Sequence, residues 1–201
     1  MKLTLKELRE IRLDQLIEVG ALFARGGDQE SINSVISVFN ERIAALSPSD
    51  KEYRSCFRSL KWCTTHESLA VQEYGATLIY DMFRATYVYD SNAHQKLIQL
   101  LQKNLVYDEG RSIGVKLWAT MALLEFAEMY WNSMASRIEA GEKLTRFRTI
   151  DLKEDVLVGT LEAAVEQELI YGYPQQYFDS IQESIAHSQQ RIAYYMQENS
   201  A

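Results

Sequence analysis

Two stretches of the chain decide the fold class: residues 68–87, SLAVQEYGATLIYDMFRATY, and residues 112–131, SIGVKLWATMALLEFAEMYW. Their starts are 44 residues apart. In each stretch apolar residues recur every three or four positions, the period of an α-helix with one buried face. Aligned at this offset, the matched pairs include Val71 with Val115, Tyr74 with Trp118, and Ile79 with Leu123. A period of about 40–47 residues is typical of stacked two-helix repeats.

The helix expected before each stretch keeps the same offset, so the repeating unit is a helix pair. Its aligned pairs are Tyr53 with Leu97, Cys56 with Leu100, and Phe57 with Leu101. Over about residues 50–135 the pattern is similar to HEAT-type repeats, which implies a stack in which equivalent positions are neighbours. The stack predicts that Arg84 lies close to Glu128. The alternative is that the helices match only because both follow the 3.6-residue period.

The chain has 201 residues and two prolines, so long stretches are free of the strongest helix breaker. We expect an all-α fold of seven or eight helices, either a HEAT-like α-solenoid or an irregular helical bundle. The expected helices cover about 5–24, 29–46, 50–63, 68–87, 92–106, 112–140, 151–169 and 175–198. Residues 1–140 are predicted to form the repeat-like main body, and residues 141–201 a C-terminal helical pair that packs on it.

Charge and cysteine content predict a cytoplasmic protein. The net charge is −7; residues 1–62 hold 10 Lys/Arg against 9 Asp/Glu, and residues 63–201 hold 11 against 19. An acidic surface disfavours broad binding to nucleic acid or anionic membranes. Cys56 and Cys63 are two turns apart on one predicted helix, too far for a disulfide, and are expected to be reduced. Neither a secretory signal nor a membrane span is expected.

A basic stripe is the first candidate binding site. Lys51, Arg54, Arg58 and Lys61 recur at spacings that place them on one narrow face of a helix. Four cations on one face suit phosphates or an acidic partner. The alternative is an ordinary solvated face opposite the apolar stripe of the same helix.

Aromatic residues around the turn near Pro174 are the second candidate. Tyr171, Tyr173, Tyr177 and Phe178 lie within eight residues. Tyrosine beside a turn is a frequent interface residue because it buries a large area at low entropic cost. The alternative is that these rings cover the end of the helical core.

The sequence offers little for catalysis. Glu125 and Glu128 lie in the most apolar helix, where carboxylates serve as acids, bases or ion-pair partners. No phosphate-binding loop, dinucleotide fingerprint, nucleophile elbow or HExxH motif occurs, and the three histidines lack the ExxH spacing of di-iron bundles. We expect neither a metal nor a cofactor.

The N-terminal third resembles TetR-type repressors at two points. Residues 21–26, ALFARG, resemble the end of their first helix, and residues 45–49, ALSPS, resemble the approach to their recognition helix. The resemblance implies DNA binding through the basic stripe and dimerisation through the C-terminal helices. However, the intervening helix at 29–46 is long for a helix-turn-helix.

Three functional hypotheses follow. The leading one is a non-enzymatic cytoplasmic adaptor or regulatory module that binds another protein through its helical surface. The second is an all-α DNA-binding regulator. The third is a helical-bundle enzyme that uses Glu125 or Glu128. Association with a second copy of the chain is left open.

Overall fold

The computed structural model describes residues 3–47, 50–85, 92–144, 146, 147 and 150–198. Within these ranges the chain is helical and contains no strand, which confirms the all-α prediction. The elements are α1 (Leu5–Glu10), α2 (Leu13–Gly26), α3 (Gln29–Ile43), α4 (Lys51–Thr64), α5 (Leu69–Ala85), α6 (Asn92–Leu101), the π-helical turn η1 (Gln102–Val106), α7 (Ile113–Glu139), α8 (Glu154–Glu166) and α9 (Pro174–Glu198).

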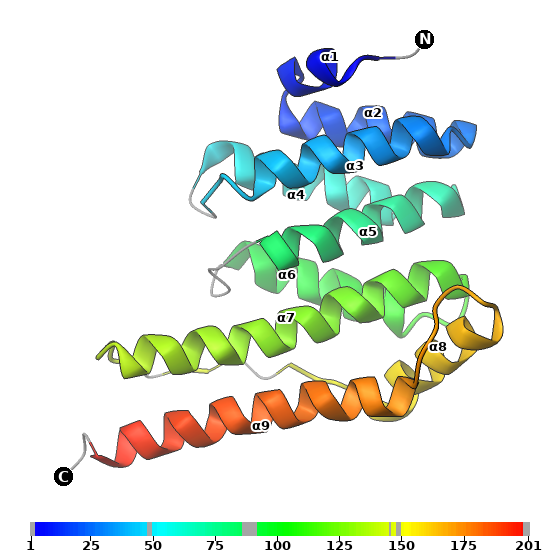
Figure 1. The fold of residues 1–201 in the computed structure, drawn as a ribbon. Coiled ribbons are helices and arrows are strands. Elements are labelled where there is room, and N and C mark those ends of the chain that lie inside the picture. Colours follow the sequence, from blue (N-terminus) through cyan, green and yellow to red (C-terminus); the bar gives the residue numbers. More distant parts are fainter. Residues whose placement is uncertain (1–2, 48–49, 86–91, 145, 148–149, 199–201) are drawn as a thin grey trace.

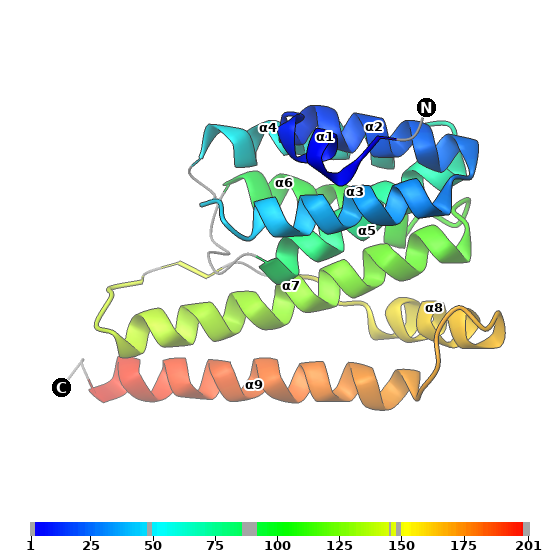
Figure 2. The ribbon, with the colours of Figure 1, turned by 45° about the horizontal axis from the view of Figure 1, so that its top comes forward.

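The helices stack in two layers (Figures 1 and 2). Helices α3, α5, α7 and α9 lie side by side in one layer, and α2, α4 and α6 lie in the other. Each helix of the first layer runs antiparallel to the helix that precedes it in the chain, and α8 packs against both α7 and α9. This is the predicted stack of antiparallel helix pairs, and it extends beyond the 50–135 region to the pairs α2–α3 and α8–α9.

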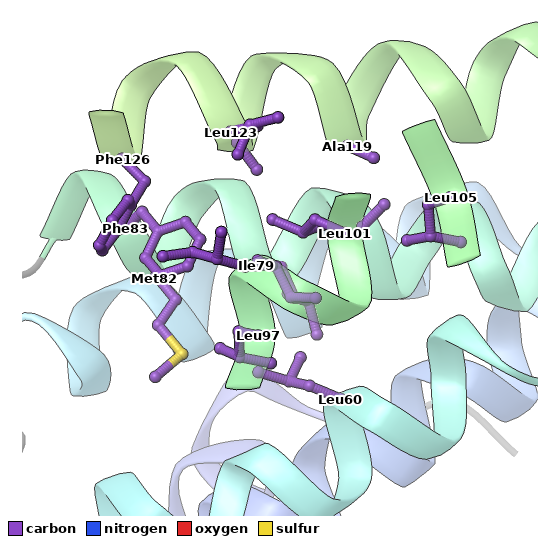
Figure 3. Close-up of a cluster of buried hydrophobic side chains, with 14 of the residues drawn as sticks. Leu60, Ile79, Met82, Phe83, Leu97, Leu101, Leu105, Ala119, Leu123 and Phe126 are labelled. Atoms are coloured by element: carbon purple, nitrogen blue, oxygen red, sulfur yellow. The ribbon is translucent and has the colours of Figure 1, made fainter. Parts of the chain in front are cut away.

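The core lies between the layers, where the two central helix pairs meet (Figure 3). Its side chains are at most 2% exposed and include Leu60, Ile79, Phe83, Leu97, Leu101, Leu123 and Phe126. The rings of Phe83 on α5 and Phe126 on α7 have centroids 5.0 Å apart. These residues belong to the apolar stripes from which the repeat is recognised in the sequence. The same side chains form the contact between neighbouring helix pairs.

Helices α5 and α7 pack against each other, although the aromatic contact between them does not join equivalent positions of the repeat, since Tyr80 aligns with Leu124 and Tyr74 with Trp118. Tyr80 and Trp118 contact each other with ring centroids 5.7 Å apart, and the Arg84 guanidinium lies 5.5 Å from the centre of the Tyr80 ring. The predicted proximity of Arg84 and Glu128 stays a prediction. Among the described residues no ion pair joins them, and Arg84 instead acts on Glu125, where burial raises the pKa of the carboxyl and the charge of Arg84 lowers it.

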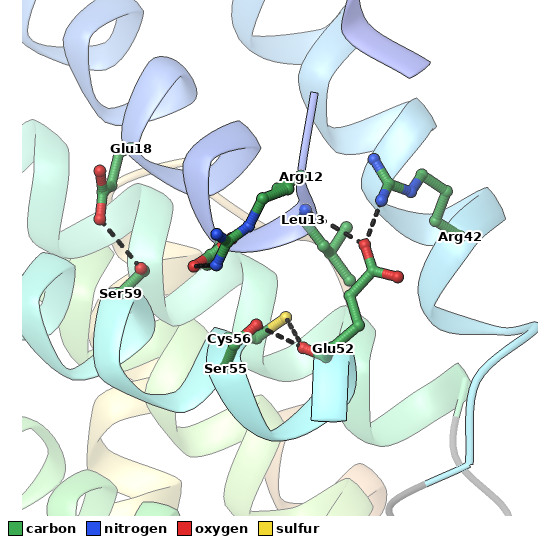
Figure 4. A network of polar contacts seen from close by, with 9 residues as sticks. Arg12, Leu13, Glu18, Arg42, Glu52, Ser55, Cys56 and Ser59 are labelled. Carbon is green, nitrogen blue, oxygen red and sulfur yellow. Dashed lines mark hydrogen bonds and ion pairs between the residues drawn. The ribbon is translucent and has the colours of Figure 1, made fainter. Parts of the chain in front are cut away.

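The prediction of one helix over 5–24 is wrong, because the chain leaves the helical conformation at Ile11 and Arg12. Arg42 donates a hydrogen bond to the carbonyl oxygen of Ile11 and forms an ion pair with Glu52. The backbone N–H of Leu13 donates to the Glu52 carboxylate at 3.3 Å (Figure 4). This network joins α3, α4 and the break between α1 and α2, so α1 turns to pack on α3.

The C-terminal pair begins later than predicted, since α8 starts at Glu154 rather than at 151. The Asp151 carbonyl oxygen accepts hydrogen bonds from the Gln102 amide and the Tyr107 hydroxyl, each at 2.9 Å. These bonds hold the chain extended before the helix. Earlier in the connection, Phe147 stacks on Trp131 with centroids 5.8 Å apart.

Two further expectations concern the cysteines and membrane spans. Cys56 and Cys63 are both free and fully buried, as expected from their spacing. Burial raises the pKa of each thiol to about 12, so neither is a reactive thiolate near neutral pH. Of the helices in the described ranges, none combines the length and the apolar character needed to cross a bilayer.

Candidate protein-binding site

The turn between α8 and α9 presents two tyrosines to solvent. Tyr171 is 89% exposed and Tyr173 is 75% exposed, the two largest values among the exposed apolar side chains. Between them Gly172 has φ of +129°, a conformation that side-chain-bearing residues rarely adopt. Pro174 then begins α9 at its first position, where its missing N–H has no helical partner to lose. The local sequence therefore fixes a turn that displays both rings.

The tyrosines border an apolar pocket of about 370 Å³. Its walls come from α7, α8, the turn and the first residues of α9, and its lining residues are Met121, Leu161, Val165, Ile170, Tyr171, Gly172, Tyr173, Pro174 and Tyr177. The structure thus brings together all three predicted tyrosines. We call this site the tyrosine pocket. Phe178, the fourth aromatic residue of the cluster, is different. It is 2% exposed and packs in the core, as the alternative interpretation of these rings expects.

A group of charges lies beside the pocket at Tyr177, whose side chain is half-buried. Burial raises the pKa of the Tyr177 hydroxyl to about 12, with contributions from the carboxylates of Glu125 and Glu128. Burial also raises the pKa of the Glu125 carboxyl; Arg84 opposes this effect and Glu128 adds to it. The Glu125 carboxyl is therefore partly desolvated in the folded protein.

Glu125 and Glu128 do not line the tyrosine pocket, whose only polar side-chain atoms are tyrosine hydroxyls. General acid–base chemistry needs the titrating group within hydrogen-bond reach of a bound substrate. The enzyme hypothesis stays a prediction, because neither Glu125 nor Glu128 lines this pocket. In the part of the chain that the structure describes, no group of three or more His, Cys, Asp or Glu side chains is placed to hold a metal ion.

The basic stripe lies on α4, in the other layer. Lys51, Arg54, Arg58 and Lys61 are all exposed on its outer face, and the tyrosine pocket draws no residue from α4. The structure therefore does not bring the two predicted sites together. Arg58 lines a second groove, between α2 and α4, together with Glu18, Leu22, Ser59 and Trp62.

The geometry around α4 bears on the TetR resemblance. Helix α3, of 15 residues, packs on α2, α5 and α1, and its connection to α4 covers residues 44–50. Pro48 and Ser49, which carry part of the resemblance, lie outside the described residues. A helix-turn-helix packs a short helix directly against the recognition helix, whereas the main partners of α4 are α2 and α5.

Sequence reasoning missed the apolar walls of both grooves. Leu161 and Val165 are four residues apart on α8, a spacing equally typical of ordinary core positions. Leu22 and Trp62 are 65% and 44% exposed and lie off the buried faces of α2 and α4. The stacking of the helices, and not the sequence of either helix, brings such side chains together in a groove.

Comparison with known proteins supplies no relative from which a function could be transferred: no protein family matches the chain, nor does any curated protein or solved structure.

Proposed function

We propose that this protein is a non-enzymatic, cytoplasmic adaptor or regulatory module that binds another protein through the tyrosine pocket. The observation that carries the proposal is the combination of two almost fully exposed tyrosines with an apolar pocket. Exposed aromatic rings around a desolvated pocket are characteristic of binding hot spots, because a partner side chain buries them together.

The pocket suits a protein partner better than a small metabolite. Small-molecule sites bury most of the ligand and orient it with a few convergent polar groups. Here the polar lining atoms are tyrosine hydroxyls, and the rings of Tyr171 and Tyr173 stand out at the rim. A partner surface that inserts one or two side chains would cover these rings, whereas a small ligand inside the pocket would leave them in water.

The test is affinity capture from the native cell with three forms of the full chain, followed by mass spectrometry. These are the wild type, Tyr171→Ala/Tyr173→Ala, and Tyr194→Ala, whose tyrosine is 57% exposed further along α9. We expect at least one protein to be captured by the wild type and by Tyr194→Ala but lost from the double variant. Identical captured sets from all three forms would contradict the proposal. Circular dichroism of each variant checks that the helices are intact.

DNA binding through α4 is the second candidate function, supported by the exposure of all four cations on one face. Its signature would be retention on DNA that decreases steeply with salt and is lost in Arg54→Ala/Arg58→Ala. On the leading proposal, neither the wild type nor this variant is retained on DNA at physiological salt.

A further inference from the structure

The surroundings of the tyrosine pocket are strongly acidic. Residues 151–183 hold eight Asp/Glu and one Lys, so the net charge of this segment is −7, the same as the net charge of the whole chain. All eight carboxylate residues are exposed: Asp151, Glu154, Asp155, Glu162, Glu166, Glu168, Asp179 and Glu183. The charge is therefore available to a partner that approaches this end of the molecule.

Part of this charge runs directly beside a wall of the pocket. Leu161 and Val165 line the pocket from α8, and Glu162 and Glu166 each follow one residue later. Since successive helix positions differ by about 100°, the two glutamates form a stripe alongside the two apolar residues. Among the described residues, no Lys, Arg or His forms an ion pair with Glu162, Glu166 or Glu168.

The third of these carboxylates occupies an unusual backbone position. Glu168 has φ of +57°, and it is the one non-glycine residue with positive φ in the described part of the chain. It lies just past the end of α8, where glycine or asparagine is the common choice, since a Cβ in this conformation costs on the order of 1 kcal/mol. This conformation lets the N–H groups of Glu168 and Leu169 donate to the carbonyl oxygens of Val165 and Ala164, which closes the helix end, and the Glu168 side chain adds a charge two residues before Ile170 of the pocket lining.

We propose that the tyrosine pocket receives one large apolar or aromatic side chain from a basic peptide segment, whose flanking Lys and Arg side chains contact the carboxylates of residues 151–183. The inference rests on the proposed function and specifies the partner. The pocket volume and the exposed tyrosine rings fit a single anchor side chain. The exposed carboxylates favour positive charge around it, above all those of Glu162, Glu166 and Glu168, while Glu154 and Asp179 accept hydrogen bonds from Gln175. Lys or Arg side chains can also stack on the tyrosine faces.

The probe is a phage-displayed library of random dodecapeptides, panned against the immobilised full chain. We expect the enriched peptides to share a positive net charge and one large apolar or aromatic residue. Enrichment of neutral or acidic peptides, or no enrichment, would overturn the inference.

Substitutions in the full chain then show which side chains contribute to peptide binding. For an enriched peptide, Tyr171→Ala/Tyr173→Ala is expected to weaken binding at least about tenfold, as the loss of a hot spot does. Glu162→Gln/Glu166→Gln is expected to weaken it about fivefold at low salt and less at high salt, because exposed charges are screened. The matched control, Glu67→Gln/Glu109→Gln, removes two exposed carboxylates outside the acidic segment and should leave binding unchanged.

The outcomes separate this inference from the proposed function. Neutral or acidic peptides that still require Tyr171 and Tyr173 would overturn the basic partner while supporting the pocket as a protein-binding site. Basic peptides that bind the tyrosine double variant as well as the wild type would overturn both, because the acidic surface alone would then explain binding.

Discussion

At the scale of single residues, Gly20 on α2 lies against the side chain of Tyr74 on α5, which belongs to the other layer. A Cβ added at Gly20 would lie 2.0 Å from the Tyr74 hydroxyl oxygen and 2.9 Å from a methyl carbon of Val35. We therefore expect Gly20→Ala to lower the free energy of unfolding by about 1–3 kcal/mol, measured by urea denaturation. Gly26→Ala is the control: a Cβ there has no atom within 4 Å, and the change should stay within about 0.5 kcal/mol.

The same contact offers a second check through the Tyr74 hydroxyl, which is buried and has no hydrogen-bond partner among the described residues. Tyr74→Phe should leave the free energy of unfolding unchanged or raise it, because it removes an unsatisfied polar group. Combined with Gly20→Ala, it should recover part of the lost stability. Full additivity of the two changes would show that the hydroxyl does not cause the clash.

Glu125 makes stability depend on pH. Burial raises the pKa of its carboxyl, so the charged form is disfavoured in the folded protein, and this cost is present at neutral pH and disappears as pH falls through the raised pKa. We expect Glu125→Gln to be more stable than the wild type at pH 7 by less than about 1 kcal/mol, since solvent screens the half-exposed group. The gain should vanish near pH 4 or so. Thermal unfolding that shows Glu125→Gln to be the less stable form at pH 7 would instead make attraction to Arg84 the dominant effect.

At the scale of elements, α9 docks on α7 through a regular seam. Its buried positions follow the alternating three- and four-residue spacing of packed helices: Phe178, Ile181, Ile185, Ser188 and Ile192. The Ser188 hydroxyl donates a hydrogen bond of 2.6 Å to the side-chain oxygen of Asn132. The Arg191 guanidinium donates two hydrogen bonds, of 2.6 and 2.5 Å, to the Glu139 carboxylate.

We expect Ile185→Ala to lower the free energy of unfolding by about 2–4 kcal/mol, because it leaves a cavity in this seam. Hydrogen exchange should increase along α9 before it increases in α5. His187→Ala, on the exposed face of the same helix, should change stability by no more than about 0.5 kcal/mol. Equal effects of the two substitutions would show that the seam is not what holds α9.

The helices themselves were largely predictable, because hydrophobic periodicity and capping residues are local. The Thr4 capping box, the Asp28 cap and the Ser112 cap occur as local patterns predict. The break at Ile11 and Arg12 was not predictable, because it depends on Arg42 and Glu52, which come from other helices. The late start of α8 has the same kind of cause, a hydrogen bond from Tyr107.

At the scale of the whole molecule, charge and apolar surface are distributed unevenly along the stack. Helix α4 carries the exposed basic stripe, and the α8–α9 end of the stack carries the tyrosine pocket within its acidic surroundings. The outer face of α9 is mostly polar, a composition typical of terminal repeats in solenoids. We therefore expect recognition at the tyrosine pocket rather than along the outer face of α9.

The tyrosine residues of the site could be predicted from the sequence, since aromatic residues cluster around a turn marked by Gly172 and Pro174. The pocket could not, because Met121 on α7 and Leu161 on α8 come together only when the helices stack. On sequence alone the basic stripe is the better candidate site, ahead of the tyrosine turn. The preference for the turn comes from the exposed rings and the adjacent cavity, both of which are three-dimensional properties.

The most direct test of the central claim is site-specific photocross-linking of the full chain in its native cell, with p-benzoylphenylalanine placed at position 171, 173 or 194. The account predicts one common cross-linked partner from positions 171 and 173, and none of that product from position 194. Absence of any cross-linked protein at 171 and 173, or the same product from all three positions, would contradict the assignment of the tyrosine pocket as the binding site.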